Sequence, residues 1–445
     1  MFMESTKKTN HSAFIIVTTL FFMWGFITVL VDALIPRLKD VFELSYFEAG
    51  LVQFAFFTAY AVFSIPGGKI ISKIGYKKGV VIGLITMGLG CFLFYPAADF
   101  RIFGVFLLAM FVLAGGITIL QVAANPYVAA LGPESSASSR LNLSQAFNSL
   151  GTFIAPLVSA AFILSSSVLS SKEVSDLSSS EQEAYYIAEA AAVQSPFLIL
   201  AGVIILLAII FAVIKLPKIL EEDDDKNGSY KIALKTHHLM LGAIGIFVYV
   251  GAEVTIGSYM VNYFLTLDIV ELIRNSGFMP GLAELLSGTG INQATPAQLA
   301  GSFVALYWGG AMVGRFIGSG LQLIIKPSKL LALYGLINVG LLLITMNSSG
   351  LFAVWTVLCI GLFNSIMFPT IFTLAIKKLG KHTAQGSGIL CTAIVGGAFV
   401  PPLFGFFADM WSLQAAFIVP ILCYLYISWY AKFGSEALPT PSHES

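Results

Sequence analysis

Residues 102–131 read IFGVFLLAMFVLAGGITILQVAANPYVAAL, a run without a single charged side chain. About 20 apolar residues in a helix cross a hydrocarbon core of about 30 Å, so this run is long enough to span a membrane. Gln121, Asn125 and Pro126 bring two amides and a proline into its second half. Polar side chains and interrupted helices near the middle of a membrane mark functional sites. The segment therefore predicts a membrane protein whose functional groups lie inside its helices.

The remainder of the chain repeats the pattern of this segment. Its 445 residues are 57% hydrophobic and 11% charged, against roughly 25% charged residues in soluble domains, so water cannot be its main solvent. Apolar runs of about twenty residues alternate with short charged or Gly/Pro-containing breaks. We predict an all-α membrane protein with twelve transmembrane helices. The predicted spans are 13–36, 46–66, 79–97, 102–131, 141–165, 196–216, 238–266, 299–325, 328–346, 350–376, 384–407 and 412–433.

Charge is distributed unevenly along the chain although its total is zero. The 24 basic residues balance 24 acidic ones, which gives no indication of a nucleic-acid partner. With an even number of spans both termini share a side, and nineteen of the 24 lysines and arginines, Arg315 among them, lie in segments assigned to that side. The positive-inside rule then places both termini in the cytoplasm. We expect an integral plasma membrane protein, which in a Gram-negative bacterium means the inner membrane.

Residues 217–236, PKILEEDDDKNGSYKIALKT, form the longest charged stretch and lie between the sixth and seventh spans. We predict a cytoplasmic linker that joins an N-terminal six-helix bundle, residues 1–216, to a C-terminal one, residues 237–445. Asn125-Pro126 in the fourth span and Phe368-Pro369 in the tenth hold matching places in these halves. Repeats with interrupted helices are typical of secondary transporters, so the two bundles are predicted to be pseudo-symmetric. The alternative is that glycine and proline are simply common in membrane helices.

The loop after the second span reads Gly68-Lys-Ile-Ile-Ser72-Lys73-Ile-Gly75-Tyr-Lys77-Lys78. It resembles the signature of the major facilitator superfamily, although Ser72 stands where that family usually has an aspartate. Glycines permit a tight turn between helices, and lysines can bind the carbonyls at a helix C-terminus or lipid phosphates. We predict a cytoplasmic gating loop, and an ordinary positive-inside loop is the alternative. Its residues are Gly68, Lys73, Gly75, Lys77 and Lys78.

Further motifs are spread over nearly the whole chain. They are Asp32-Ala-Leu-Ile-Pro36 in the first span, Gln121-Val-Ala-Ala-Asn125-Pro126-Tyr127 and Leu131-Gly-Pro-Glu134 at the fourth, Arg140-Leu-Asn142-Leu-Ser-Gln145-Ala-Phe-Asn148-Ser in the fifth, Tyr249-Val-Gly-Ala-Glu253 in the seventh and Phe368-Pro-Thr-Ile-Phe372 in the tenth. Together they resemble the fucose–proton symporter and glucose/galactose porter branch of the major facilitator superfamily. The resemblance implies twelve helices in two bundles, alternating access and a monosaccharide substrate.

Asp32 and Glu253 are acids within predicted spans. An acid there costs about 2.5–3.5 kcal/mol even on the lenient insertion scale, so each one requires a compensating role. We predict that both couple transport to a proton or a sodium ion. The structural alternatives are that Asp32 lies at the outer interface near Arg37 and Lys39, and that Glu253 joins two helices by a hydrogen bond.

The resemblance also implies a difference from the fucose branch. That branch carries its second essential acid at the position matching Gln121 and an amide at the position matching Glu253. In this chain the amide and the acid have exchanged places, which favours the glucose/galactose type over the fucose type.

Neutral polar residues are expected to bind the sugar. Trp24 and Thr28 share one helical stripe with Asp32 and offer a flat apolar face and a hydroxyl. Amides in the fourth and fifth spans match sugar hydroxyls because they both donate and accept hydrogen bonds. Their alternative role is to hold helices together. The predicted substrate-binding residues are Trp24, Thr28, Gln121, Asn125, Asn142, Gln145 and Asn148.

The functional classes to be weighed are a coupled symporter, an uncoupled facilitator or pore, and an intramembrane enzyme. The chain has no nucleophile–base constellation, no phosphate-binding glycine–lysine loop and no H-E-x-x-H pair, and its four cysteines lie singly in apolar runs. We therefore expect no enzyme, no metal site and no cofactor apart from the co-transported proton or sodium ion. Two acids inside the membrane favour cation-coupled symport of a hexose such as glucose or galactose. L-Fucose–proton symport and uncoupled sugar facilitation are the alternatives. The expected partners are the monosaccharide and membrane lipid, and the expected state is a monomer.

Overall fold

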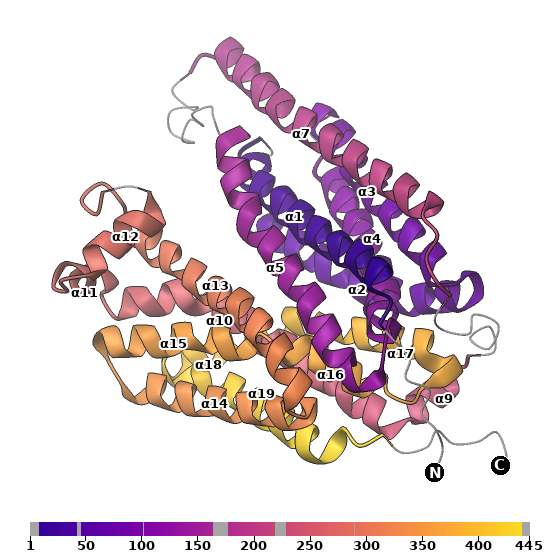
Figure 1. Ribbon diagram of the computed structural model, residues 1–445. Coiled ribbons are helices and arrows are strands. Elements are labelled where there is room, and N and C mark those ends of the chain that lie inside the picture. Colours follow the sequence, from indigo (N-terminus) through magenta and orange to yellow (C-terminus); the bar gives the residue numbers. More distant parts are fainter. Residues whose placement is uncertain are drawn as a thin grey trace. The chain divides into compact units, whose positions relative to one another are not determined.

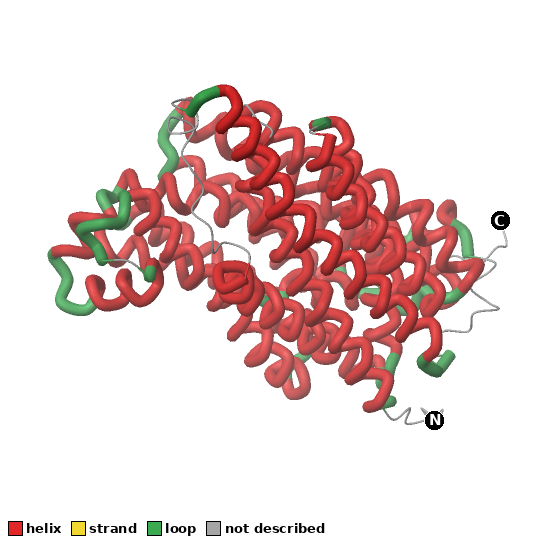
Figure 2. The backbone as a smooth tube through the Cα atoms, turned by 90° about the horizontal axis from the view of Figure 1, so that it is seen from above, coloured by secondary structure: helices red, strands yellow, loops and turns green. Residues whose placement is uncertain are grey.

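The computed structural model describes residues 9–41, 46–100, 102–162, 177–218, 228–288 and 290–437. Within these ranges every regular element is a helix (Figures 1 and 2). The longer helices are α1 (His11–Val41), α2 (Tyr46–Ile74), α3 (Tyr76–Phe100), α4 (Phe103–Ala130), α5 (Ala137–Phe162), α7 (Ser179–Val213), α10 (His237–Thr266), α13 (Pro296–Ile324), α14 (Pro327–Asn347), α15 (Gly350–Asn364), α17 (Thr383–Thr392), α18 (Gly396–Met410) and α19 (Ile418–Trp429). The shorter elements are η1 (Glu134–Ser136), α9 (Tyr230–Lys235), α11 (Ile269–Arg274), α12 (Met279–Ser287), α16 (Met367–Ala375), η2 (Gly380–His382), η3 (Ala393–Val395), η4 (Ala415–Phe417) and η5 (Tyr430–Gly434).

Within the described residues, each of the twelve predicted spans overlaps one helix or a run of two or three consecutive helical elements. Ten helical segments of the described chain are long and apolar enough to cross a membrane. The described part of α5 and helix α13 fall outside these ten. Both carry polar groups at buried positions, such as Arg140 and Asn142 in α5 and Gln322 in α13, which lower the hydropathy of the helix without shortening it.

Two spans of the second half are interrupted where the sequence has proline or paired glycines. Residues 365 and 366 form a turn between α15 and α16, and Pro369 lies in the first turn of α16. Proline has no N–H and clashes with the preceding turn, so it ends or bends a helix. The 3-10 turn η3 separates α17 from α18, which begins at Gly396. A Cβ at Gly396 would overlap the carbonyl oxygen of Phe247, so α18 approaches α10 more closely than a larger residue would allow.

Helix α4 continues unbroken through Pro126. An ordinary residue at this position would donate its N–H to the carbonyl oxygen of Val122, one turn earlier. Instead, the Ser387 hydroxyl of α17 donates to that oxygen at 2.8 Å. A side chain distant in the sequence thus replaces the backbone donor that proline removes.

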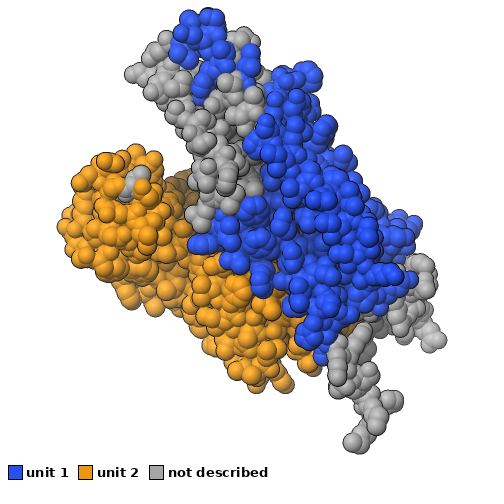
Figure 3. Space-filling view, turned by 45° about the horizontal axis from the view of Figure 1, so that its top comes forward, with its two compact units in different colours: residues 1–134, 147–233, 379–392 blue, residues 135–146, 234–378, 393–445 orange. Residues whose placement is uncertain are grey.

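The chain separates into two compact units (Figure 3). In unit 1, α4 packs against α2 and α3, α7 packs against α3, and α17 packs against α2 and α4. In unit 2, α10 contacts α13, α16, α18 and α19. Unit 1 comprises Met1–Glu134, Phe147–Ala233 and Leu379–Thr392, and unit 2 comprises Ser135–Ala146, Leu234–Lys378 and Ala393–Ser445. The units reflect proximity in one structure, so the division into bundles at 1–216 and 237–445 with the linker 217–236 stays a prediction.

Candidate functional site

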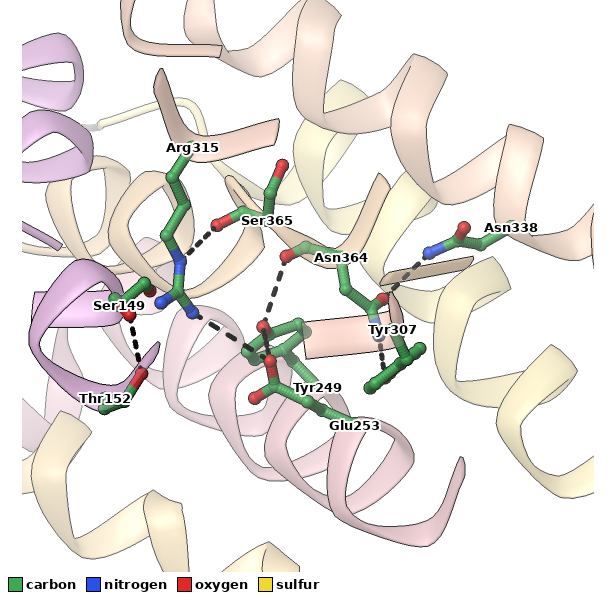
Figure 4. A network of polar contacts seen from close by, with 9 residues as sticks. All are labelled: Ser149, Thr152, Tyr249, Glu253, Tyr307, Arg315, Asn338, Asn364 and Ser365. Carbon is green, nitrogen blue, oxygen red and sulfur yellow. Dashed lines mark hydrogen bonds and ion pairs between the residues drawn. The ribbon is translucent and has the colours of Figure 1, made fainter. Parts of the chain in front are cut away.

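Glu253 lies on α10, one helical turn after Tyr249 (Figure 4). The Tyr249 Oη lies 2.7 Å from Glu253 Oε1 and 3.2 Å from the carbonyl oxygen of Asn364. Because a phenol carries one proton, the shorter contact marks Glu253 as its main acceptor. The Glu253 side chain is 14% exposed. It is therefore a largely buried carboxylate that accepts a hydrogen bond from its own helix.

Arg315 of α13 places a positive charge beside this carboxylate (Figure 4). Its Nη2 lies 4.0 Å from Glu253 Oε1, and its Nε donates to the carbonyl oxygen of Ser365 at 3.1 Å. In a continuous helix the Ser365 oxygen would accept from the N–H of residue 369, which Pro369 lacks. The proline that interrupts the span thus leaves a carbonyl that accepts from the guanidinium.

Asn364 connects this pair to further buried side chains in unit 2 (Figure 4). Its Nδ2 donates to Tyr307 Oη at 2.7 Å, and its Oδ1 accepts from Asn338 Nδ2 at 2.8 Å. These bonds join α13, α14 and the end of α15 just before the break. The Asn338 Oδ1 at the far end of this chain of bonds has no hydrogen-bond partner among the described residues, whereas both polar atoms of the Asn364 side chain are paired.

Gly314 allows α13 to approach the interrupted span. A Cβ at this position would lie 2.6 Å from the Ser365 hydroxyl oxygen, closer than real Cβ contacts. On the facing helix, a Cβ at Gly361 would overlap the carbonyl oxygen of Tyr307. The reach of Arg315 to the turn therefore depends on the glycine that precedes it.

The stripe predicted on α1 is described in part. Trp24 is buried, and the Thr28 hydroxyl donates to the carbonyl oxygen of Trp24 at 2.9 Å, within its own helix. The side chain of Asp32 lies outside the described residues. The roles of these three residues stay predictions.

The two amides of α4 differ in their surroundings. Gln121 Nε2 donates to the Tyr60 hydroxyl oxygen of α2 at 2.7 Å. Asn125 is completely buried, and neither its Nδ2 nor its Oδ1 has a hydrogen-bond partner among the described residues. Leaving a buried polar group unpaired costs about 1–3 kcal/mol, so such a group requires an explanation. Binding to a ligand hydroxyl would provide one.

The amides predicted on α5 lie in both units. Asn148 Nδ2 donates to the carbonyl oxygen of Phe21 on α1 at 2.9 Å, within unit 1. Asn142 Nδ2 donates to Gln322 Oε1 of α13 at 2.5 Å, within unit 2. Gln145 is buried. In this structure Asn142 and Asn148 each join α5 to another helix, and a role in sugar binding remains a prediction.

The predicted gating loop is a tight connection between α2 and α3. Gly75 has a φ of 87°, a left-handed value that glycine adopts without strain. Lys77 Nζ donates to the carbonyl oxygen of Ala212 in the last turn of α7 at 2.8 Å. The Ser72 hydroxyl, in the place of the family's aspartate, donates to the carbonyl oxygen of Lys69 at 2.9 Å.

Gly68 lies where α2 meets two other segments of unit 1. A Cβ there would lie 2.5 Å from the Tyr230 hydroxyl oxygen and 2.7 Å from the carbonyl oxygen of Ala384. Lys73 lies in the last turn of α2, and Lys78 lies in the first turn of α3. The loop is thus closely packed at its glycines and charged at its lysines, while its gating role stays a prediction.

The profile of the Major Facilitator Superfamily matches residues 13–394. The chain belongs to the Major Facilitator Superfamily. It is therefore an integral membrane transporter and not an enzyme. Among the described residues, no group of three or more His, Cys, Asp or Glu could hold a metal ion.

Other members of the superfamily are similar over nearly the whole chain. A glucose/galactose transporter of Brucella abortus is 49% identical and covers 97% of this chain and 96% of its own length. The L-fucose-proton symporter of Escherichia coli is 36% identical and covers 95% of this chain and 93% of its own length. The crystal structure of FucP, a superfamily transporter in the outward conformation, matches with a TM-score of 0.84 and 34% identity over 95% of this chain and 99% of that chain. The predicted all-α fold and the predicted branch of the superfamily are confirmed.

The network around Glu253 contains residues that the sequence did not single out. They are Tyr307, Arg315, Asn338 and Asn364. The charge count groups Arg315 with the basic residues near the cytoplasm, whereas the structure places it well inside α13. Charged residues inside membrane spans, basic as well as acidic, tend to be functional. Applying this rule to basic residues would have identified Arg315 from the sequence.

Proposed function

We propose that this transporter carries out cation-coupled symport of a hexose, such as glucose or galactose, by alternating access. The observation that carries the proposal is the buried Glu253 carboxylate, which lies between the Tyr249 hydroxyl and the Arg315 guanidinium. An uncoupled facilitator has no need of ionisable groups inside the membrane, where each is costly. A symporter needs them because a cation must bind and leave in every cycle.

The choice of substrate is supported by two observations. The Brucella abortus relative, described as a glucose/galactose transporter, is similar to the chain over almost its full length. The buried and unpaired amide of Asn125 suits a sugar hydroxyl, which both donates and accepts a hydrogen bond. We propose that Asn125 and Gln121 bind the sugar together with Trp24, Thr28, Asn142, Gln145 and Asn148.

The orientation and the moving parts are also proposed. Both termini lie in the cytoplasm, and the bundles 1–216 and 237–445 alternate in exposing the site to the two sides. Asp32 and Glu253 couple this movement to a proton or a sodium ion. The loop from Gly68 to Lys78 closes the cytoplasmic side.

L-Fucose–proton symport is the second candidate, because the symporter of Escherichia coli is also similar over most of the chain. Gln121 argues against it. The fucose branch has an acid at this position, whereas this chain has an amide that is paired with the Tyr60 hydroxyl.

Counterflow in proteoliposomes tests the proposal. Liposomes that contain the purified protein are loaded with D-glucose, D-galactose or L-fucose in turn, and the pH and the sodium concentration are varied independently. We expect exchange of glucose or galactose and uphill uptake driven by one of the two cation gradients. Exchange that no cation gradient can convert into accumulation would establish a facilitator, and exchange of L-fucose alone would establish the second candidate.

A further inference from the structure

We propose that Arg315 is a positioning residue that sets how tightly Glu253 binds the co-transported cation. Arg315 is held by the Ser365 carbonyl, which Pro369 leaves without a backbone donor. The inference rests on the proposed role of Glu253 in coupling.

The geometry of Arg315 differs from that of an ordinary buried ion pair. Charge-assisted hydrogen bonds between a guanidinium and a carboxylate are about 2.7–2.9 Å long and are often bidentate. Here the Arg315 Nη2 lies 4.0 Å from Glu253 Oε1, while the Nε is bonded to Ser365 at 3.1 Å. The guanidinium is thus close enough to attract the carboxylate, but it is held short of a direct hydrogen bond.

Three features of the sequence produce this arrangement. Pro369 removes the N–H that would otherwise occupy the Ser365 carbonyl. Gly314 lets α13 approach the turn that contains Ser365. Asn364, the residue before the turn, is fixed by its bonds to Tyr307 and Asn338. The carbonyl that accepts from Arg315 therefore has a fixed position.

Charged and titratable groups around the carboxylate come from three helices. Arg315 of α13 lies 4.0 Å from it and Tyr249 donates to it from its own helix, while Tyr307 of α13 and Tyr424 of α19 are near enough to interact with it electrostatically. On α18, Asp409 is near enough to interact electrostatically with Tyr259, which lies further along α10. Arg315 is the cation of this set, so its distance from Glu253 governs the electrostatic environment of the site.

This arrangement explains how a cation could bind beside an arginine. A guanidinium in direct contact would compete fully with a proton or a sodium ion for the carboxylate. A guanidinium held at a distance lowers the affinity for the cation without blocking the carboxylate. When the cation neutralises Glu253, Arg315 keeps its bond to Ser365 and does not have to move.

The cation dependence of sugar counterflow tests this inference in the full-length protein in liposomes. Removing the charge in Arg315→Gln should raise the apparent cation affinity about tenfold or more, because an opposite charge within roughly 4–6 Å changes proton affinity by about one to three orders of magnitude. Pro369→Ala should lower the cation affinity several-fold. The restored N–H competes with Arg315 Nε for the Ser365 carbonyl, which weakens this bond and lets the guanidinium move closer to Glu253.

Matched variants separate positioning from a general loss of structure. Pro402→Ala also restores an N–H within a helix, on an exposed part of α18, and should leave the cation affinity unchanged. Damage to the fold would not shift the affinity in opposite directions in Arg315→Gln and Pro369→Ala. If the Arg315→Gln protein is not obtained in folded form, the test rests on Pro369→Ala, because this variant retains the charges of both Arg315 and Glu253.

Glu253→Gln distinguishes failure of the inference from failure of the proposed function. If the counterflow that this variant retains has the cation dependence of the parent, Glu253 does not couple transport and the proposed function loses its basis. If it loses that dependence while Arg315→Gln and Pro369→Ala match the parent, the role of Arg315 alone is overturned.

Discussion

Single polar residues carry the chemistry of this protein because its surroundings are almost entirely apolar. Glu253 is held between the Tyr249 hydroxyl and the Arg315 guanidinium. Asn125 is buried without a hydrogen-bond partner among the described residues, whereas the neighbouring Gln121 is paired with Tyr60. These differences in pairing predict different responses to substitution.

The two acids are expected to respond differently to neutralisation. Asp32→Asn should abolish uphill accumulation but retain sugar exchange, because exchange never requires the empty, cation-free carrier to reorient. Glu253→Gln should impair exchange as well, because this residue is predicted to contact the sugar or the cation directly. Uptake and counterflow measured in parallel on both variants check the assignment. Accumulation against a gradient by Asp32→Asn would make Asp32 structural.

Substitutions of the two amides of α4 are expected to have similar effects on sugar affinity but different effects on the free energy of unfolding. Gln121→Ala and Asn125→Ala each remove a sugar-binding group worth about 1–2 kcal/mol, so sugar affinity should fall roughly five- to thirtyfold in both. Gln121→Ala also leaves the Tyr60 hydroxyl unpaired and should lower the free energy of unfolding by about 1 kcal/mol. Asn125→Ala removes a group that is already unpaired, so stability should be unchanged or higher. Binding titrations and thermal unfolding in detergent measure the two effects, and unchanged affinity in both variants would return the amides to a packing role.

At the scale of elements, the two proline-containing spans solve the same problem in different ways. Pro126 leaves Val122 without a backbone donor in a continuous helix, and the Ser387 hydroxyl takes its place. Pro369 interrupts the helix, and the donor to Ser365 is a charged side chain, Arg315. The first half thus holds a neutral contact where the second half holds a charge.

The contact at Val122 predicts a compensating pair of substitutions. Ser387→Ala leaves a buried carbonyl unpaired and should lower the free energy of unfolding by about 1–3 kcal/mol. Adding Pro126→Ala supplies an N–H to the same carbonyl, so the double variant should recover much of that loss. Thermal unfolding of the parent, both single variants and the double variant gives the coupling energy. Strictly additive effects would show that the hydrogen bond contributes nothing.

At the scale of the whole molecule, two short segments do not belong to the same unit as most of the predicted bundle that contains them. They are residues 135–146 of the N-terminal bundle and residues 379–392 of the C-terminal bundle. The first turns of α5 lie in unit 2, where Ser138 Oγ is 2.6 Å from Thr373 Oγ1 and Ser139 donates to the carbonyl oxygen of Ser319 at 2.7 Å. Helix α17 lies in unit 1. If the moving bodies are the predicted bundles, these contacts must break and form again during transport. Such bonds are individually worth about 1 kcal/mol, which suits contacts that form and break repeatedly.

The proposed orientation is tested by cysteine labelling in intact cells. Cys359 is exposed and is first replaced by serine, while the other three cysteines are buried. Glu284→Cys on α12 should then react with an impermeant reagent added from outside, because the charge asymmetry places this segment outside. Lys326→Cys, before α14, should react only after the membrane is permeabilised. The reverse pattern would invert the topology.

The sequence by itself determined the fold class, the positions of the spans and the presence of acids inside them. These properties depend on local composition, because one apolar run of sufficient length becomes a spanning helix whatever its neighbours are. It also identified Glu253, since a buried charge is anomalous in any apolar run. Only the tertiary structure decided what surrounds that charge. Tyr249 and Asn364 are 115 positions apart and Arg315 and Ser365 are 50 apart, so their meeting depends on how helices pack. The same holds for Asn142, whose amide is paired with Gln322 because α5 packs against α13 at this point.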